Sequence, residues 1–330
     1  MDYALSGNYR TLLIELMLTD PGSTVYIFQD SEYNDVVGRM ENAGFICFCY
    51  KRKRSRNEFI NLLAYYKQDF KLRRFLKLLK FDKNRDRVLG CDHICALFKY
   101  FRCCKDITVI EEGFSNYTNR KQLYDEYGIG TLRFFLLRLV MFQWNLLTYK
   151  PYGYDASVKE LWLTGLRDIP EELINKTKFI NLEDLWNACN QEIINKVFNF
   201  DKGIYDNKSV IITQPLSEDG ICSEERKIKI YSNLIKRADY PVIIKKHPRD
   251  MTNYGIFFKE VIVDADDYPF ELLVLNKVNF SQVLTVTSTA AYQCIGLCDV
   301  IVLGTLNYPD LQKKLGVHEE KIFRKGEKKA

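Results

Sequence analysis

The chain has 330 residues, and single hydrophobic cores stop growing near about 250–300 residues, so we expect two domains. Its content of 47% hydrophobic and 28% charged residues is ordinary for a soluble globular protein. The net charge of +5 is too small to indicate nucleic acid binding by itself.

The ten cysteines are typical of a reduced, cytosolic protein and not of a disulfide framework. Many lie in or beside apolar runs, where a free thiol packs as a small hydrophobic side chain. Examples are the pairs Cys47/Cys49, Cys103/Cys104 and Cys294/Cys298. The segment Cys91-Asp92-His93-Ile94-Cys95 resembles half of a zinc site, but no second Cys/His pair follows nearby at zinc-site spacing. We therefore expect no bound metal.

The N-terminus lacks the charged and then apolar pattern of a signal peptide. The most apolar long stretch covers residues 131–149 and contains Arg133 and Arg138. Two arginines make this stretch a poor membrane span. It is expected to form a buried amphipathic helix.

The first half of the chain alternates predicted strands and helices. After a short first strand at residues 1–5, apolar runs predict strands at 24–28, 45–49, 107–110 and 160–164. Helical periodicity predicts long helices at 57–80 and 132–147. The apolar side of the first helix carries Phe59, Leu62, Leu63, Tyr66, Phe70, Phe75 and Leu79. This alternation implies a mostly parallel sheet covered by helices.

A helical connection at residues 182–198 and a linker at 201–208 precede a second alternating half. Its strands are predicted at residues 209–213, 241–245, 261–263, 283–287 and 300–303, and its helices at 223–237, 270–276 and 290–297. We therefore expect an α/β fold of two Rossmann-like domains, 1–204 and 205–330, that face a central cleft.

The most informative stretch is Lys245-Lys246-His247-Pro248-Arg249, which follows the predicted strand at 241–245. A His-Pro step at a strand end places an imidazole at the carboxyl edge of a sheet, where ligands bind in open α/β folds. The three surrounding cations favour an anionic ligand. Taken alone, a His-Pro step is more often only a turn.

Further polar residues follow other predicted strands. Ser288-Thr289 offers hydroxyls and backbone N–H groups at a helix start, which suits a phosphate, although one hydroxyl could simply cap the helix. Residues 214–220 and 269–271 follow two more strands of the second half. In the first half, Glu111-Glu112-Gly113 ends a strand and suits either a site or a solvated turn.

Three of these features, in this order, resemble the motif set of bacterial sialyltransferases: an acidic pair followed by glycine, a His-Pro step and a Ser/Thr pair. They are Glu111-Glu112-Gly113, His247-Pro248 and Ser288-Thr289. With residues 214–220 and 269–271, the chain is most similar to glycosyltransferase family 52, which includes lipooligosaccharide and capsular sialyltransferases. The resemblance covers about residues 5–309. The chain departs from the pattern in its Glu-Glu pair, where relatives have Asp-Asp, and in its very short first strand.

The resemblance implies a GT-B fold, a CMP-sialic acid donor (CMP-Neu5Ac) and inversion at the anomeric carbon, with no cofactor and no metal. It implies transfer to a terminal galactose of a bacterial surface glycan, either lipooligosaccharide or capsular polysaccharide, through an α-2,3 linkage. Domain 1–204 would lie on the acceptor side, and domain 205–330 would bind the CMP-sugar. The protein would be cytoplasmic and could form a homodimer, for which residues 132–147 offer an apolar surface.

The resemblance also implies roles at the donor phosphate. His247 would protonate or stabilise the CMP leaving group, and Ser288 and Thr289 would donate hydrogen bonds to it. Lys246 and Arg249, together with Lys245, would surround the anionic donor.

Further roles concern the nucleoside and the acceptor. Glu271 would accept hydrogen bonds from the ribose hydroxyls, and Pro248 would pack against the cytosine. Asp219 is the first choice for the base that deprotonates the acceptor hydroxyl. Glu218 and Glu112 remain alternatives for this base.

Two charged stretches allow other interpretations. The run Asp264-Ala265-Asp266-Asp267 resembles the metal-binding motif of a GT-A enzyme, but we expect a solvated acidic turn. The densest basic region comprises residues 51–54, Arg56 and a helix face with Lys67, Lys71, Arg73, Arg74, Lys77 and Lys80. No aromatic-interleaved nucleic acid motif accompanies it, so no nucleic acid partner is expected. The default interpretation is a solvated helix face, and peripheral contact with an anionic inner-leaflet membrane is an attractive alternative.

Two rival functions remain open. A GT-B transferase could use another nucleotide sugar, which competition between CMP and UDP would reveal. A non-catalytic scaffold of capsule assembly could keep the fold without the chemistry, although the intact set Asp219, His247, Glu271, Ser288 and Thr289 argues against it.

Overall fold

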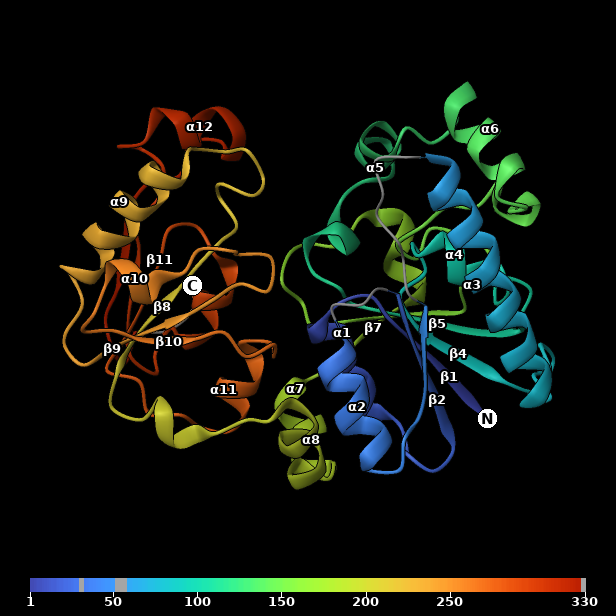
Figure 1. Cartoon of the computed structure of the whole chain (residues 1–330), viewed down its shortest axis with the longest axis horizontal. Coiled ribbons are helices and arrows are strands. Elements are labelled where there is room, and N and C mark those ends of the chain that lie inside the picture. The colour runs from blue at the N-terminus through green and yellow to red at the C-terminus, as the bar shows by residue number, and fades with distance from the viewer. Residues whose placement is uncertain (30–32, 51–57, 328–330) are drawn as a thin grey trace. The chain divides into compact units, whose positions relative to one another are not determined.

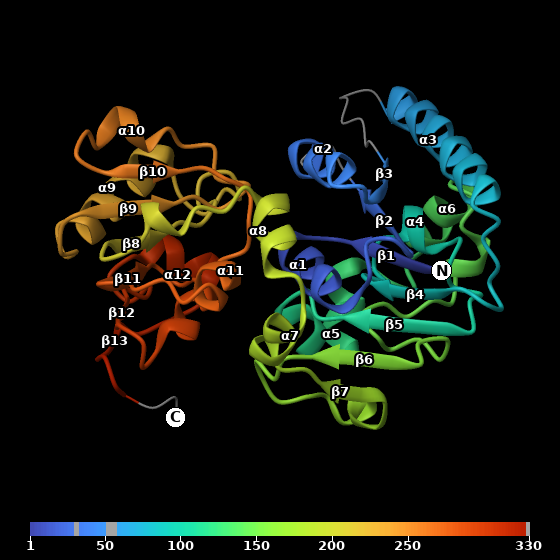
Figure 2. The same cartoon turned by 90° about the horizontal axis from the view of Figure 1, so that it is seen from below.

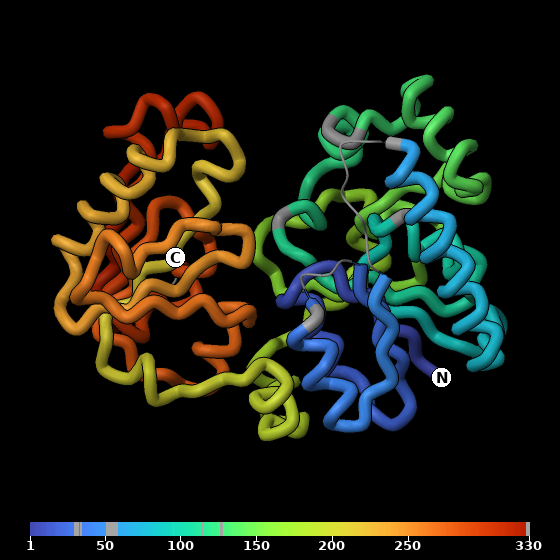
Figure 3. Tube along the Cα trace, in the orientation of Figure 1, coloured from blue at the N-terminus to red at the C-terminus, as the bar shows by residue number. Residues whose placement is uncertain are grey.

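The computed structural model of the chain describes residues 1–29, 33–50 and 58–327 (Figure 1). It divides into two compact units, Met1–Phe198 and Asn199–Ala330, whereas the sequence prediction places the division between residues 204 and 205. Each unit contains a twisted sheet with helices against it, and Figure 3 traces the course of the chain through both.

The first unit is built on a seven-stranded parallel sheet in the order β3-β2-β1-β4-β5-β6-β7. Its strands are β1 (Asp2–Ser6), β2 (Thr24–Gln29), β3 (Ile46–Tyr50), β4 (Arg87–Gly90), β5 (Asp106–Ile110), β6 (Glu160–Leu163) and β7 (Thr177–Phe179). Figure 2 shows β4 to β7 side by side. The order reverses between β1 and β4, so the carboxyl ends of these neighbours form the switch point where such folds bind ligands.

The helices of the first unit connect consecutive strands. They are α1 (Tyr9–Leu18), α2 (Asn34–Asn42), α3 (Glu58–Leu78), α4 (Cys95–Phe98), α5 (Arg120–Tyr127), α6 (Leu132–Val140), α7 (Leu182–Ala188) and α8 (Gln191–Phe198). Short 3-10 turns are η2 (Phe114–Tyr117), η3 (Trp144–Leu146) and η4 (Glu171–Lys176). The Asn8 side chain caps α1 by accepting a hydrogen bond from the Thr11 N–H at 2.8 Å, so the helix begins directly after β1.

The second unit contains a six-stranded sheet in the order β10-β9-β8-β11-β12-β13. The strands are β8 (Ser209–Ile212), β9 (Val242–Lys245), β10 (Ile262–Asp264), β11 (Gln282–Thr285), β12 (Asp299–Val302) and β13 (Lys321–Phe323). All pairs are parallel except β12 with β13. The helical elements are η5 (Lys202–Ile204), α9 (Glu224–Ile235), α10 (Tyr254–Phe257), α11 (Glu271–Leu275), η6 (Thr289–Cys294) and α12 (Pro309–Leu315). Its order reverses between β8 and β11.

Helix α3 confirms the predicted helix, but the predicted apolar side is partly wrong. Leu72 and Leu76 are buried, whereas Phe59, Leu63 and Phe70 are exposed. The first half of α3 lies against the end of α6, where the Tyr65 hydroxyl donates a hydrogen bond to the Met141 carbonyl at 2.8 Å. Tyr65 also contacts Tyr50 of β3, with ring centres 6.4 Å apart, so this side of the helix is covered while Phe59, Leu63 and Phe70 stay exposed on other sides.

The expectation of one buried helix at residues 132–147 is wrong. Helix α6 spans only Leu132–Val140 and contains no buried residue. It stops because Phe142 adopts a left-handed conformation with φ of +50°, and the Gln143 N–H returns to the Arg138 carbonyl at 2.8 Å. The short turn η3 follows. Among the described residues, no helix has both the length and the apolar character needed to cross a membrane.

Candidate active site

The candidate site of the second unit lies at the carboxyl ends of β8, β9 and β11. Thr213, directly after β8, accepts a hydrogen bond through its hydroxyl from the His247 N–H at 3.0 Å. Its neighbour Gln214 accepts hydrogen bonds from the backbone N–H and the hydroxyl of Thr287, both at 3.0 Å. The central strand therefore fixes the loop that carries His247 and the loop that leads into Ser288.

The half-buried imidazole of His247 has a defined tautomer. Its Nδ1 accepts a hydrogen bond from the Arg249 backbone N–H at 3.1 Å, which leaves the proton of the neutral ring on Nε2. Burial and the nearby Arg249 charge lower the pKa of His247. At neutral pH this arrangement offers an approaching anion one N–H donor.

The loop after β8 brings Asp219 to the His247 loop. The Arg249 guanidinium binds the Asp219 carboxylate through two nitrogens, at 2.5 and 3.1 Å. Both side chains are partly exposed, at 55% for Arg249 and 34% for Asp219. The structure thus places together three residues that the sequence separates by up to 30 positions.

A buried lysine on α9 holds the two loops against each other. Lys227 has no exposed side-chain surface, and its Nζ lies 2.6 Å from Asp250 and 2.8 Å from Glu218. The Met251 N–H donates a further hydrogen bond to Glu218 at 2.6 Å. Burial alone would raise the pKa of Glu218, but the bonds from Lys227 and Met251 lower it to about 2. Lys227 was not identified from the sequence, where nothing separates it from the other lysines of α9.

The Ser288-Thr289 pair begins the 3-10 turn η6, in place of the α-helix predicted at residues 290–297. The Ser288 backbone N–H donates to the Thr285 hydroxyl at 3.2 Å, and the Ser288 side chain makes no capping hydrogen bond. Thr289 is exposed. The pair was interpreted either as a helix cap alone or as a phosphate site, and the structure gives no support to the cap.

The other predicted donor-binding residues lie around the same edge. Glu271 is buried at the start of α11 and accepts a hydrogen bond from Gln293 of η6 at 2.9 Å, which links these two segments. Lys246 is half-buried, and Pro248 is exposed.

Two charged residues near this edge differ from expectation. Lys245 is buried, with its Nζ 3.3 Å from Asp264 and 3.7 Å from the centre of the Tyr268 ring. Burial lowers the pKa of Lys245. Asp264 also accepts a hydrogen bond from the Tyr268 hydroxyl at 2.5 Å. The predicted solvated turn is therefore wrong at Asp264, which is buried. Lys245 was expected among the cations around the donor, but it forms an internal ion pair with Asp264.

In the first unit, the two side chains of the predicted acidic pair contact different neighbours. Glu111 is fully buried and pairs with Arg10, while its carboxylate also accepts bonds from the N–H and hydroxyl of Thr164, both at 2.7 Å. The Tyr117 hydroxyl is a further donor to it. Glu111 therefore connects the loop after β5 to the loop after β6.

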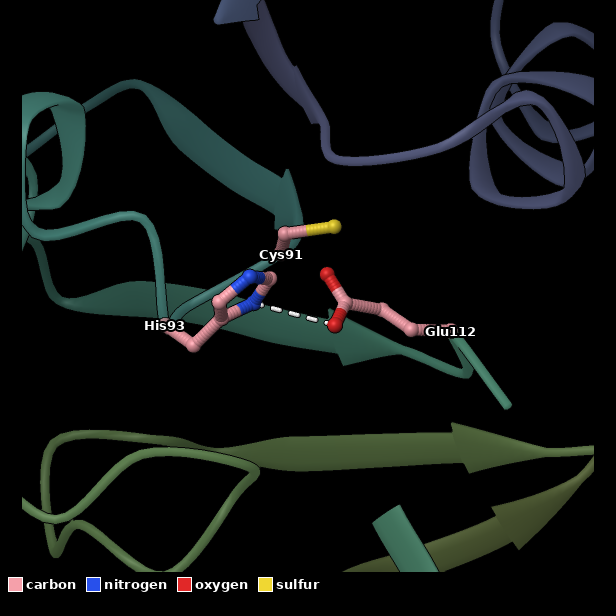
Figure 4. A group of neighbouring side chains, drawn as sticks. All are labelled: Cys91, His93 and Glu112. Atoms are coloured by element: carbon pink, nitrogen blue, oxygen red, sulfur yellow. Dashed lines mark ion pairs between the residues drawn. The ribbon is translucent and has the colours of Figure 1, made fainter. Parts of the chain in front are cut away.

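Glu112 points instead toward His93 and Cys91, which follow β4 (Figure 4). The His93 Nδ1 lies 3.0 Å from a carboxylate oxygen of Glu112. Gly113 has a φ of +150°, a conformation that favours glycine, and it begins the turn into η2. The zinc pattern of residues 91–95 is incomplete, so the sequence did not predict a site at His93; the short run Val88-Leu89 before Gly90 was the available sign of a strand end.

The model of glycosyltransferase family 52 matches residues 28–305. An uncharacterised protein of Haemophilus influenzae is 27% identical over 325 residues, which cover 95% of this chain and 97% of that protein.

The structure is similar to that of an alpha/beta-galactoside alpha-2,3-sialyltransferase from Photobacterium phosphoreum, with a TM-score of 0.55 and 13% identity over 94% of this chain and 93% of that one. A UDP-GlcNAc 2-epimerase from Methanocaldococcus jannaschii has a TM-score of 0.49 and 14% identity, over 96% of this chain and 91% of that one. The likeness to the Photobacterium enzyme and the two Rossmann-like units confirm the predicted α/β GT-B fold. Because the family model matches residues 28–305, which are most of the chain, the chain belongs to glycosyltransferase family 52.

Proposed function

We propose that this glycosyltransferase is a sialyltransferase. It transfers sialic acid from CMP-sialic acid to a terminal galactose of a bacterial lipooligosaccharide or capsular polysaccharide, with inversion and an α-2,3 linkage. The observation that carries the proposal is the cluster of His247, Arg249 and Asp219 at the sheet edge of the second unit. A neutral imidazole donor beside an acidic side chain suits a reaction in which one group leaves as an anion and another loses a proton.

The proposed reaction is a single displacement. The acceptor hydroxyl oxygen attacks the anomeric carbon of sialic acid, the bond from that carbon to the phosphate oxygen breaks, and CMP leaves with the electron pair. The Nε2–H of His247 donates a hydrogen bond to the phosphate as negative charge grows on it. The base takes the acceptor proton, so charge and atoms balance without a metal or a cofactor.

We assign the remaining contacts with CMP-sialic acid to residues that lie near His247 at the sheet edge. Ser288 and Thr289 donate hydrogen bonds to the phosphate, and Lys246 and Arg249 provide positive charge near the two anionic groups of the donor. Glu271 accepts hydrogen bonds from the ribose hydroxyls. Pro248 packs against the cytosine.

Asp219 remains the preferred base, and the structure supplies an argument against Glu218. Two hydrogen bonds and a buried lysine stabilise Glu218 as an anion with a pKa of about 2, so it accepts a proton poorly. Asp219 is partly exposed and pairs only with Arg249 among the described residues. Glu112 in the first unit is the remaining alternative.

Calorimetry with CMP, with UDP as the control ligand and EDTA present, tests the donor class. We expect CMP to bind without metal and UDP to bind far more weakly. Because His247 supplies the phosphate donor, His247→Ala should weaken CMP binding by about 1.5–3 kcal/mol, the value of a hydrogen bond to a charged group. His318→Ala, which changes an exposed histidine of the same unit, should bind CMP like the wild type.

Each contrary result selects a different function. Binding of UDP in preference to CMP would favour a GT-B transferase that uses another nucleotide sugar. Binding of neither nucleotide would favour a non-catalytic role in capsule assembly. Equal CMP binding by His247→Ala and the wild type would remove His247 from the mechanism.

We also propose that the protein contacts an anionic membrane at the cytoplasmic face, where lipid-linked glycan acceptors would be present. Support comes from α6 and the segment after it, whose exposed apolar side chains we call the α6 ridge. It comprises Leu132, Phe135, Leu136, Leu137, Val140, Phe142 and Trp144. Arg133 and Arg138 lie on the same helix, and the exposed lysines and arginines of α3 lie on the helix that contacts it. Apolar and basic side chains together are typical of helices that lie in a membrane interface.

Of the basic region predicted earlier, residues 51–54 and Arg56 fall outside the described residues.

A further inference from the structure

The carboxyl edge of the first unit brings together a thiol, an imidazole and a carboxylate. Cys91 directly follows β4, His93 lies two residues later, and Glu112 lies after β5. Their possible ligand atoms all lie within 4.8 Å of one another. We propose that Cys91, His93 and Glu112 of the first unit bind a zinc ion.

The distances suit coordination. Zinc lies about 2.0–2.1 Å from histidine nitrogen and carboxylate oxygen in tetrahedral sites, so two such ligands lie about 3.3 Å apart. The His93 Nδ1 and the Glu112 Oε2 are 3.0 Å apart. Figure 4 shows the Cys91 sulfur and both Glu112 oxygens on the same side of the imidazole. Small side-chain movements are therefore enough to admit an ion between them.

Burial provides a second, independent observation. The Glu112 side chain is only 10% exposed, and its Oε1 has no nitrogen or oxygen donor within hydrogen-bonding geometry among the described residues. A buried carboxylate oxygen without a partner is costly, because it has lost water and gained nothing in return. The Cys91 side of this oxygen is also closed to water, since Cys91 is 1% exposed. A cation bound here would remove the cost.

Gly7, at the end of β1, leaves space for these atoms. A Cβ at this position would lie 2.4 Å from the Cys91 sulfur and 2.6 Å from the Glu112 Oε1. Any larger residue would displace both proposed ligands. The two atoms approach each other because the backbone beside them has no side chain.

Surrounding contacts orient the ligands in advance. The Glu112 N–H donates to the Asn116 side-chain oxygen at 2.8 Å, and Asn8 donates to the Glu112 carbonyl at 3.1 Å. The His93 ring stacks on Tyr152, with centres 5.2 Å apart and planes within 7°. The buried Asp92 carboxylate accepts bonds from the Tyr152 and Gly153 N–H groups, both at 2.8 Å, and so fixes the stacking partner. Such outer contacts are typical of metal sites.

The set of ligands selects the metal. A thiolate with an imidazole and a carboxylate favours zinc over magnesium or calcium, which prefer oxygen ligands. Three protein ligands leave a fourth position, and His93 is 31% exposed, so water or an external ligand can occupy it. Binding requires the Cys91 thiol to become a thiolate, with its proton released to the solvent.

Titration of the chelator-stripped, full-length protein tests the site. Zinc affinity is measured by calorimetry, and cobalt(II) is the spectroscopic probe, because a thiolate ligand gives it a charge-transfer absorption band. We expect one ion per chain and a thiolate band with the wild type. Cys91→Ser should abolish the band and His93→Gln should lower zinc affinity by at least about 100-fold, because each change removes a side chain that binds the ion directly. Cys104→Ser, a change of another buried cysteine in this unit, should leave both readouts unchanged.

The proposal is overturned if the wild type binds no stoichiometric zinc, or if Cys91→Ser and His93→Gln bind it like the wild type. Loss of the band in Cys104→Ser but not in Cys91→Ser would assign the metal to other thiols and also reject the site. If Cys91→Ser does not fold, His93→Gln decides alone, because the partly exposed His93 leaves the core unchanged. CMP calorimetry in EDTA tests the proposed function separately, so either proposal can fail without the other.

Discussion

At the scale of single residues, Glu218 is the clearest case of a side chain whose role is decided by a partner on another element. Buried Lys227 stabilises its carboxylate, so the pKa of Glu218 falls to about 2 on folding. A carboxyl group with a lowered folded pKa stabilises the folded state at pH values above its unfolded pKa of about 4.3, and the contribution disappears as the pH falls through the folded pKa.

Glu218→Gln removes this contribution. At pH 7 we expect the free energy of unfolding to fall by about 1–3 kcal/mol, because a hydrogen-bonded charge beside a buried lysine is lost. The difference from the wild type should be the same at pH 5.5 and should shrink between about pH 4.5 and 2. Urea unfolding at these pH values measures it, with the exposed Glu225→Gln as the control. A difference that does not depend on pH would contradict the assigned ion pair.

The sequence predicted residues of the candidate site where a short motif carries them, and it could not predict their partners. His247, Ser288 and Asp219 were located from strand ends and from family resemblance. Lys227 and Thr213 were missed because their importance depends on which loops the sheet brings together. For the same reason Lys245 was misread, since its partner Asp264 lies on the neighbouring strand.

At the scale of elements, the buried parallel strands were predicted well, because a strand covered on both faces is a continuous apolar run. The predicted strand at residues 24–28 is β2, Thr24–Gln29. Strand β4 was missed because its four residues contain only two strongly apolar side chains, Val88 and Leu89. That omission hid the position of His93 at a strand end and therefore its closeness to Glu112.

The α6 ridge supports a test of membrane contact. Leu132 is 73% exposed and Leu136 is 50% exposed, so the double change to glutamate should leave thermal stability unchanged. It should abolish binding to anionic vesicles, because two apolar anchors are replaced by charges that the vesicle surface repels. Co-sedimentation at low salt measures binding, and Val317→Glu, which changes an exposed apolar side chain of the second unit, is the control.

Two outcomes would contradict membrane contact through the α6 ridge. One is the absence of wild-type vesicle binding at low salt. The other is unchanged vesicle binding by the double variant. If the variant instead converts a dimer to a monomer in solution, the ridge is an interface between two copies of this chain.

At the scale of the whole molecule, each unit has its own hydrophobic core. Tyr3, Val25 and Leu161 belong to the core of the first unit, and Ile211 and Leu284 to that of the second. The segment predicted as a linker at residues 201–208 is tied to the second unit, because buried Tyr205 donates a hydrogen bond to Asp264. Gly203 and Asn207 predicted an interdomain linker, and the buried tyrosine explains why the segment packs against the second unit.

Separate cores imply that a nucleotide should protect one unit and leave the other nearly unchanged. Hydrogen exchange of the full chain with and without CMP measures this, because ligand binding adds its free energy to local opening. We expect slower exchange at residues 213–219, 246–252 and 286–290, the loops that Thr213, Gln214 and Lys227 hold at the sheet edge. Backbone groups of β1 and β4 in the first unit serve as the internal control. Protection confined to the first unit would mean that the nucleotide binds at its switch point, beside Glu112, and that the donor site assigned to the second unit is wrong.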